Sequence, residues 1–135
     1  MPLPRARNLQ YQETQVFPID LASVAATTTV KFAKVKNRKF RVDSVQYINP
    51  TGFVQDPANY WAVTLNNGAT VAASWSTLTG AQGTIAANTF VEVVPSATDA
   101  NLVFSDADVM SVVMTKTGAP AALPAGRLLV HGRYV

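Results

Sequence analysis

Residues 60–76 read YWAVTLNNGATVAASWS, and this stretch decides the fold class. Two runs with the period-two pattern of β-strands flank the dipeptide Asn67-Gly68. Asn-Gly is preferred in two-residue β-hairpin turns because both turn positions require positive φ. The stretch therefore predicts a hairpin of two antiparallel strands, at 60–66 and 69–76.

The turn also predicts which side chains share a face of this hairpin. A two-residue turn places Thr64 opposite Val71 and Tyr60 opposite Trp75. One face would carry Trp61, Val63, Leu65 and Ala72, and the other Tyr60, Ala62, Val71, Ala73 and Trp75. Because neither face is polar, we expect one face to line the core. The other needs a second sheet, a subunit or a ligand to cover it.

Further short strands are predicted on both sides of the hairpin. Runs of β-branched and aromatic residues are separated by turn signals every 8 to 15 residues, without a convincing long helix. The runs are 24–36, 39–48, 84–85, 90–94, 102–104, 109–115 and 127–134. In the run 39–48 the apolar residues change phase between Val42 and Val45, which predicts a bulge near Asp43 and Ser44 or burial on both faces. The pattern predicts an all-β chain, an antiparallel β-sandwich or jelly roll of about eight strands.

The first 23 residues differ from the remainder. They contain three of the eight prolines and show neither helical periodicity nor a helix-capping signal. We expect residues 1–23 to form an extended or irregular N-terminal arm that reaches a neighbouring molecule, and residues 24–135 to form the β-sandwich domain. The full length of 135 residues is that of a single domain.

The residues of common enzyme sites are scarce. The chain has no cysteine and a single histidine, His131, so the usual triads and the usual zinc and iron sites lack their parts. We expect no enzyme activity, with no catalytic, cofactor-binding or metal-ligating residues. The turn Asp106-Ala107-Asp108 lacks the glycine and spacing of a calcium loop, and we interpret it as a solvated turn. His131 shares a strand face with Arg127 and Arg133, and we interpret it as an interface or surface residue.

Charge is segregated along the chain, although the net charge is only +3. Residues 1–41 hold eight basic and two acidic residues, whereas residues 42–115 hold six acidic residues and no basic ones. The segment 31–41 is the main basic cluster, with Phe32 and Phe40 between its cations. Cations and rings could bind nucleic acid, but no recognisable nucleic-acid motif accompanies them. We favour a basic turn that faces acidic groups of a protein partner, and expect no nucleic-acid partner.

The predicted interface combines residues of the arm, the basic cluster and the aromatic hairpin. Its members are Arg5, Arg7, Tyr11, Phe17, Lys34, Lys36, Arg38, Lys39, Tyr60 and Trp75. The chain has no apolar run long enough to cross a membrane, and its first residues lack the apolar stretch of a secretory signal. We therefore expect a soluble protein, made in the cytoplasm and without a membrane partner.

A group of turns and strand ends carries a resemblance to a known class of proteins. The segments are Phe40-Arg41-Val42-Asp43-Ser44-Val45, Tyr47-Ile48-Asn49-Pro50-Thr51-Gly52, Asn67-Gly68-Ala69-Thr70-Val71, Ser74-Trp75-Ser76-Thr77 with Gly80, Gln82-Gly83-Thr84, Ser96-Ala97-Thr98-Asp99-Ala100-Asn101-Leu102, Leu123-Pro124-Ala125-Gly126-Arg127 and Val130-His131-Gly132-Arg133-Tyr134-Val135. Together they span about seventy per cent of the chain. With these segments the chain resembles head structural proteins of tailed bacteriophages, of the capsid decoration or cement type.

The resemblance implies a virion structural protein on the outer surface of the capsid, which binds the major capsid protein and stabilises the head shell. It also implies self-association, with a homotrimer as the expected form, after synthesis in the host cytoplasm. It implies no catalytic residues and no cofactor. The alternative is a carbohydrate-binding or adhesion module of a phage fibre or spike, in which Tyr60, Trp61 and Trp75 would stack on sugar rings.

Overall fold

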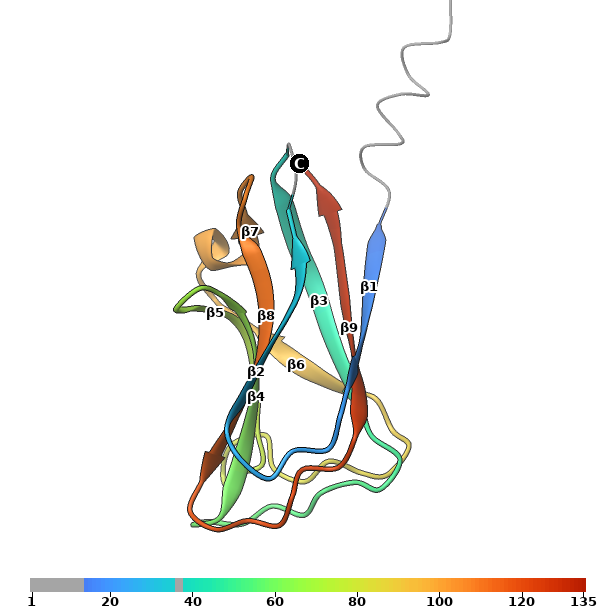
Figure 1. Cartoon of the computed structure of the whole chain (residues 1–135), viewed down its shortest axis with the longest axis vertical. Coiled ribbons are helices and arrows are strands. Elements are labelled where there is room, and N and C mark those ends of the chain that lie inside the picture. Colours follow the sequence, from blue (N-terminus) through green and yellow to red (C-terminus); the bar gives the residue numbers. More distant parts are fainter. Residues whose placement is uncertain (1–13, 36–37) are drawn as a thin grey trace, which may run out of the picture.

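The computed structural model describes residues 14–35 and 38–135, which form nine strands and one short 3-10 helix (Figure 1). The elements are β1 (Gln15–Leu21), β2 (Thr28–Lys34), β3 (Phe40–Ile48), β4 (Tyr60–Asn67), β5 (Thr70–Ser76), β6 (Val91–Pro95), η1 (Asp99–Leu102), β7 (Val103–Phe104), β8 (Val109–Thr117) and β9 (Gly126–Tyr134). All named strand pairs are antiparallel. The predicted all-β antiparallel fold is confirmed.

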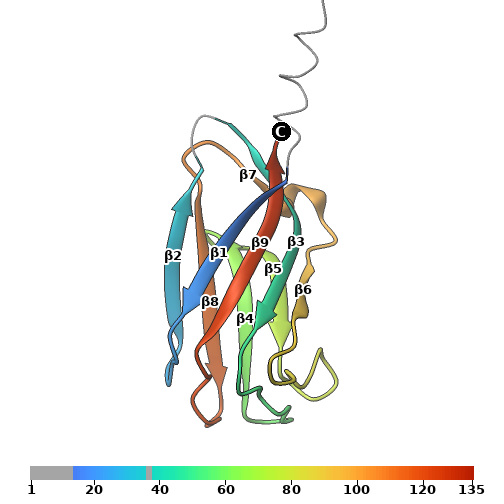
Figure 2. The same ribbon diagram turned by 90° about the vertical axis from the view of Figure 1, so that its right-hand side faces the viewer.

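The strands form one hydrogen-bonded path that is folded into two layers. Its order is β1-β9-β3-β6-β5-β4-β8-β2, with β7 paired to β3. One layer holds β1, β9 and β3, and the other holds β5, β4, β8 and β2 (Figures 1 and 2). β6 joins the layers, because Val93 pairs with β3 while Val94 pairs with β5. Strands that change sheet in this way form the corner of a β-sandwich.

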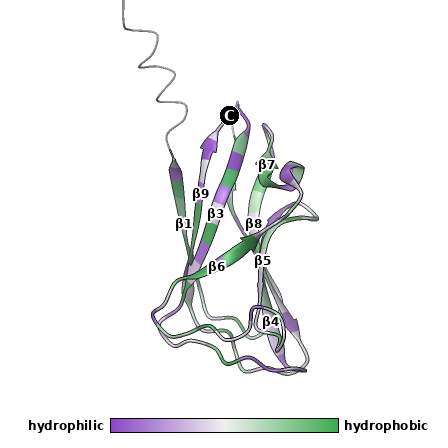
Figure 3. Cartoon of the chain, turned by 180° about the vertical axis from the view of Figure 1, so that it is seen from behind, coloured by the Kyte–Doolittle hydropathy of each residue, from purple (hydrophilic) through white to green (hydrophobic). Residues whose placement is uncertain are grey.

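The core lies between the two layers and follows the alternation of the strands. In β3, buried and partly exposed residues alternate over much of the strand, and its colours alternate in Figure 3. In β4, Trp61, Val63 and Leu65 are buried while their neighbours are half-buried. The largest fully buried side chains include Trp61, Tyr47, Phe40, Phe104 and Leu65. Each large apolar side chain buried in this way contributes about 1.5–3 kcal/mol relative to an exposed one.

Strand β1 lies within the range that the sequence assigns to the arm. Gln15–Leu21 pairs along its whole length with β9, and Phe17, Ile19 and Leu21 pack on or within the core. Pro18, which donates no backbone hydrogen bond, is tolerated because β1 is the first strand of the path and has a free edge. Residues 15–21 are therefore part of the sandwich, and the period-two pattern of their apolar residues is the signal for it.

The predicted hairpin of β4 and β5 forms, but the predicted register between its two strands is wrong. The turn residues are Gly68 and Ala69, Asn67 pairs with Thr70, and a bulge shifts the register between Leu65 and Asn66. Gly68 has a φ of 57° and occupies the first central position, where a type II′ turn requires glycine. The backbone at Asn67 does not have positive φ, so the expected Asn-Gly type I′ turn is absent from this hairpin.

The bulge changes which residues share a face. Leu65 pairs with Ala73, and Val63 pairs with Trp75, so Ala73 and Trp75 lie on the core side. Thr64 pairs with Ser74 on the outer side. The prediction of two apolar faces is therefore wrong, because the extra residue of the bulge moves the apolar end of β5 to the core face.

The predicted bulge in β3 is confirmed. Its register against β9 shifts between Val42 and Ser44. Close to this point, Gly132 of β9 lies directly against β3, where an added methyl group would collide with the carbonyl oxygen of Arg41 and the ring of Phe40. The glycine allows the strands to pair while the Phe40 ring lies over the backbone of β9.

Candidate interaction site

Basic side chains gather at one end of the sandwich. Phe40 pairs with Tyr134, and Ile48 at the other end of β3 pairs with Arg127, so the start of β3 and the end of β9 meet. Among the described residues, the cations at this end, which we call the basic end, include Arg38, Lys39, Arg41 and Arg133. The C-terminus lies there too, and the chain enters β1 at the same end (Figure 1).

A row of aromatic rings supports the basic end. Phe17 and Phe40 meet edge to face with ring centroids 5.2 Å apart, and Phe40 meets Tyr134 in the same way at 5.3 Å. The guanidinium of Arg38 lies 4.6 Å from the centroid of the Tyr134 ring, a cation–π contact. The backbone N–H of Val135 also donates to the carbonyl of Lys39 at 2.9 Å. These contacts fix Arg38 on the sandwich body.

Arg41 and Arg133 each form an ion pair. Arg41 Nη2 lies 3.1 Å from Asp99 Oδ1, and Arg133 Nε lies 3.8 Å from Asp43 Oδ2. Both pairs are partly exposed, so each contributes little to stability. Lys39 is exposed and has no polar side-chain partner among the described residues. Asp99 and Asp43 therefore offset part of the charge of Arg41 and Arg133, while Lys39 presents its charge to solvent.

The predicted interface residues are only partly brought together. Arg38, Lys39 and Phe17 lie at the basic end, with Phe17 inside the aromatic row. Lys34 ends β2, where its backbone pairs with Val109. Four residues of the prediction lie outside the described residues, namely Arg5, Arg7, Tyr11 and Lys36.

The hairpin aromatics do not form a platform. Trp61 is 0% exposed and donates from Nε1 to the carbonyl of Ala121 at 2.8 Å. Trp75 packs against the core, and its buried Nε1 has no hydrogen-bond partner among the described residues. Tyr60 is half-buried at the start of β4, where it pairs with Thr117. These positions do not support the sugar-stacking role of the three aromatics, because Trp61 and Trp75 face the core.

His131 and the acidic turn take simple structural positions. His131 Nε2 lies 3.2 Å from Gln46 Oε1 on the outer face of the β1-β9-β3 layer. Asp108 Oδ2 accepts hydrogen bonds from Asn67 Nδ2 at 2.8 Å and from the Ser105 backbone N–H at 2.7 Å. The carboxylate of Asp108 thus connects the turn before β8 to the β4–β5 hairpin.

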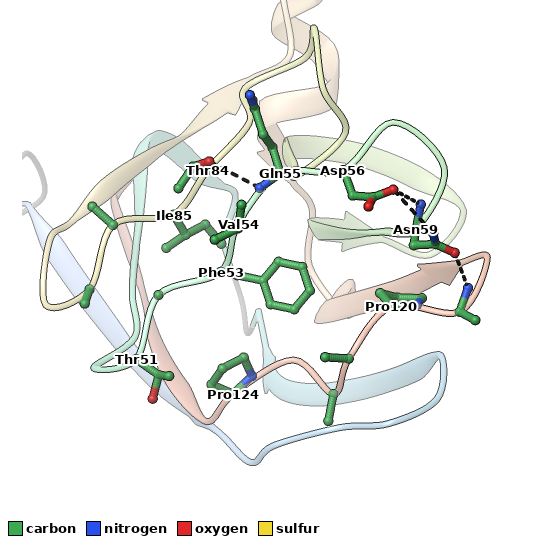
Figure 4. Close-up of a pocket in the computed structure, with 16 residues that line it drawn as sticks. Thr51, Phe53, Val54, Gln55, Asp56, Asn59, Thr84, Ile85, Pro120 and Pro124 are labelled. Carbon is green, nitrogen blue, oxygen red and sulfur yellow. Dashed lines mark hydrogen bonds between the residues drawn. The ribbon is translucent and has the colours of Figure 1, made fainter.

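A hollow lies at the opposite end of the sandwich, with a volume of about 760 Å³ (Figure 4). Three segments that are distant in sequence surround it: 51–59 before β4, 84–87 before β6, and 119–124 between β8 and β9. The ring of Phe53 lies near its centre in Figure 4, between Val54 and the prolines Pro120 and Pro124. Phe53 is held in place by two 2.8 Å backbone hydrogen bonds with Ile85.

Polar groups line one side of this hollow. Asp56 Oδ1 accepts from the backbone N–H groups of Ala58 at 2.8 Å and Asn59 at 2.6 Å. These two bonds stabilise the carboxylate and lower the pKa of Asp56 below its ordinary value of 3.8. Asn59 Oδ1 in turn accepts from the backbone N–H of Ala119 at 2.8 Å. The polar side therefore connects the first and third segments of the hollow.

The hollow was not predicted from the sequence. Phe53 stands in the turn segment after β3, and no periodic pattern marks it as part of a site. The available signal was chemical: Phe53, Asp56 and Asn59 combine a ring, a carboxylate and an amide within seven residues. Their meeting with Pro120 and Pro124 depends on the long-range pairing of β4 with β8.

Comparisons with known proteins give few matches. No protein-family model matches the chain, and no curated protein matches it. Among solved structures, a chain in the structure of infectious bursal disease virus, Gx strain, is similar with a TM-score of 0.38 and 13% sequence identity. The match covers 91% of this chain and 33% of that chain, so this chain spans about a third of its length. At this TM-score the likeness carries no functional argument.

Within residues 14–35 and 38–135, no helix has the length and hydropathy needed to cross a membrane.

Proposed function

We propose that this chain is a virion structural protein, a decoration or cement protein that binds the outer surface of a tailed-phage head shell and stabilises it. The resemblance of residues 40–135 to phage head proteins suggests this role, and an antiparallel β-sandwich is compatible with it. The partners would be the major capsid protein and further copies of this chain.

The observation that carries the proposal is the basic end. Arg38, Lys39 and Arg133 lie at the end of the sandwich where the chain enters β1, and the aromatic row packs there. Arg5 and Arg7 precede β1 in the sequence and lie outside the described residues. A surface with exposed cations suits docking to an acidic protein surface.

Repetition of this contact would make the binding strong. A head shell presents the same acidic surface many times, and a small oligomer of this chain would engage several copies at once. Each bound copy raises the effective concentration of the next contact, so weak individual contacts add to a firm attachment. In this role the protein needs no bound cofactor and carries out no reaction.

The direct test is a binding measurement with heads that lack this protein. The purified chain is mixed with empty expanded heads, pelleted by ultracentrifugation and quantified in the pellet, while its mass alone is measured by light scattering. We expect saturable binding that weakens as salt is raised. Heads with bound protein should also resist heat or chaotrope better than bare heads.

Two results would contradict the proposal. One is the absence of the chain from pelleted heads at low salt. The other is binding without any gain in the resistance of the heads, which would leave attachment but remove the cement role.

A further inference from the structure

We propose that the hollow at the end opposite the basic end binds a neutral pyranose sugar, with Phe53 as the apolar platform and Asp56 as the acceptor for sugar hydroxyls. This inference does not depend on the proposed capsid role. It also differs from the sugar-stacking role suggested by sequence for Tyr60, Trp61 and Trp75, because it uses none of these three residues.

The size and shape of the hollow suit a small ligand. Its volume of about 760 Å³ falls within the range of about 300–1,000 Å³ that is usual for small-molecule sites. Its walls come from three loops that are tied together rather than from one mobile segment. Besides the bonds of Phe53 to Ile85 and of Asn59 to Ala119, Trp61 Nε1 holds the carbonyl of Ala121. A site formed in advance in this way loses little entropy on binding.

The apolar side of the hollow matches the C–H faces of a pyranose ring. Phe53 is half-buried, so part of its ring remains accessible, and Val54 beside it is 74% exposed. Figure 4 shows Pro120 and Pro124 on the far side of the Phe53 ring. Aromatic faces carry negative potential and attract weakly polarised C–H groups, which gives a flat sugar ring a favourable surface.

The polar side of the hollow matches hydroxyl groups. The hydrogen bonds that Asp56 accepts from described residues all end on Oδ1, so Oδ2 remains an acceptor for an incoming O–H. Because the carboxylate is ionised, a hydrogen bond to it is stronger than one to a neutral group. Thr84 Oγ1 accepts from the backbone N–H of Gln55 at 3.2 Å, and its own hydroxyl hydrogen is then available to donate.

The charge of the hollow selects against anions. Among the described residues that line it, Asp56 is the single ionisable side chain, and no lysine, arginine or histidine accompanies it. A phosphate, a sulfate or an acidic sugar would meet a negative charge without a compensating cation. A neutral ligand with several hydroxyl groups and one apolar face fits both sides of the hollow.

The test uses the full chain and neutral sugars of defined structure. ¹⁵N-labelled protein is titrated with methyl glycosides of glucose, galactose, mannose and N-acetylglucosamine at millimolar concentration, and amide shifts are followed by NMR. We expect at least one glycoside to shift amides of residues 51–59, 84–87 and 119–122 in a saturable way. Sialyllactose serves as the anionic comparison and should bind more weakly than the best neutral sugar.

Two variants test the assigned roles. Phe53→Leu keeps an apolar side chain but removes the ring, and we expect it to weaken binding by at least about tenfold, or ~1.4 kcal/mol. Asp56→Asn keeps Oδ1 as the acceptor for the loop and removes the charge, so it should fold even where Phe53→Leu does not, and should also weaken binding. Phe90→Leu is the matched control, because Phe90 is 47% exposed and does not line the hollow.

The inference is overturned if none of the four glycosides shifts the amides of the hollow. It is equally overturned if binding persists unchanged in both Phe53→Leu and Asp56→Asn. Shifts of the same amides that depend on protein concentration without any sugar would show instead that a second copy occupies the hollow. Retained binding in Phe90→Leu together with loss in the two site variants supports it.

Discussion

Val63 and Trp75 are direct partners across β4 and β5, and this pairing turns the Trp75 indole toward the core. Val63 itself is 1% exposed. The pairing exists because a bulge in the hairpin adds one residue to β5, which moves Trp75 to the side opposite the one that simple alternation predicts. A residue that the sequence suggests as a contact for partners therefore packs against the core of its own domain.

The first prediction concerns this tryptophan. Trp75→Ala should lower the free energy of unfolding by about 3 kcal/mol, because it removes much of a large side chain from the core face. Trp75→Phe should cost less than about 1.5 kcal/mol, because it keeps an aromatic ring and removes a buried N–H without a partner. Urea unfolding of both variants beside the parent measures these values. An unchanged midpoint in Trp75→Ala would place the indole outside the core.

The second prediction concerns the close approach of β9 to β3. Gly132→Ala should destabilise the protein by about 1–3 kcal/mol, because the methyl group collides with the Arg41 carbonyl and the Phe40 ring. The same variant should disturb the aromatic row, which near-ultraviolet circular dichroism detects through Tyr134. A variant with the parent melting temperature and spectrum would show that the two strands have room to separate.

The third prediction concerns the pH dependence of stability. The backbone hydrogen bonds of Ala58 and Asn59 favour the charged form of Asp56, and its pKa in the folded state lies below the ordinary value. This contribution is complete above the unfolded pKa and is lost as the pH falls through the folded pKa. Asp56→Asn should therefore make the urea midpoint less dependent on pH as the pH falls below the ordinary pKa of 3.8. Identical slopes for the variant and the parent would contradict this.

The fourth prediction concerns the basic end. Lys39→Glu should leave the melting temperature nearly unchanged, because the residue is exposed. The variant should bind heads more weakly, and its binding should be less sensitive to salt. Lys31→Glu is the matched control, since Lys31 is exposed on β2 and pairs with Ser111 in the other layer. Equal losses of head binding in the two variants would show that overall charge, and not the basic end, controls docking.

The fifth prediction concerns self-association. Val16, Pro18 and Leu129 share the outer face of the β1–β9 pair, and Val16 is 47% exposed. We expect a trimer or another small oligomer that uses this face, and expect Val16→Glu to shift it toward the monomer of 14.4 kDa. Light scattering over a range of concentrations measures the oligomer mass. Val54→Glu is the control, because Val54 is also exposed but lies at the hollow, away from this face. A parent protein that remains monomeric throughout would refute the prediction.

Local patterns in the sequence determined the fold class. Alternation in 39–48 and 127–134 predicted β3 and β9, and the change of phase after Val42 located the bulge in β3. Such features are readable because side-chain alternation and turn preference depend on neighbours within a few residues. The same alternation was present in β1, but the prolines around it suggested an arm, and only pairing with β9 shows that residues 15–21 belong to the sheet.

Tertiary structure decided the register of β5 and the composition of both ends of the molecule. The bulge that turns Trp75 inward depends on how β4 pairs with β5 while β6 joins the two layers. The hollow around Phe53 and the aromatic row from Phe17 to Tyr134 each assemble side chains from opposite parts of the chain. Most of the strand segments could be predicted from the sequence, because strand preference is local. Which side chains meet at the ends of those strands follows from long-range hydrogen bonding and packing, and no local pattern encodes it.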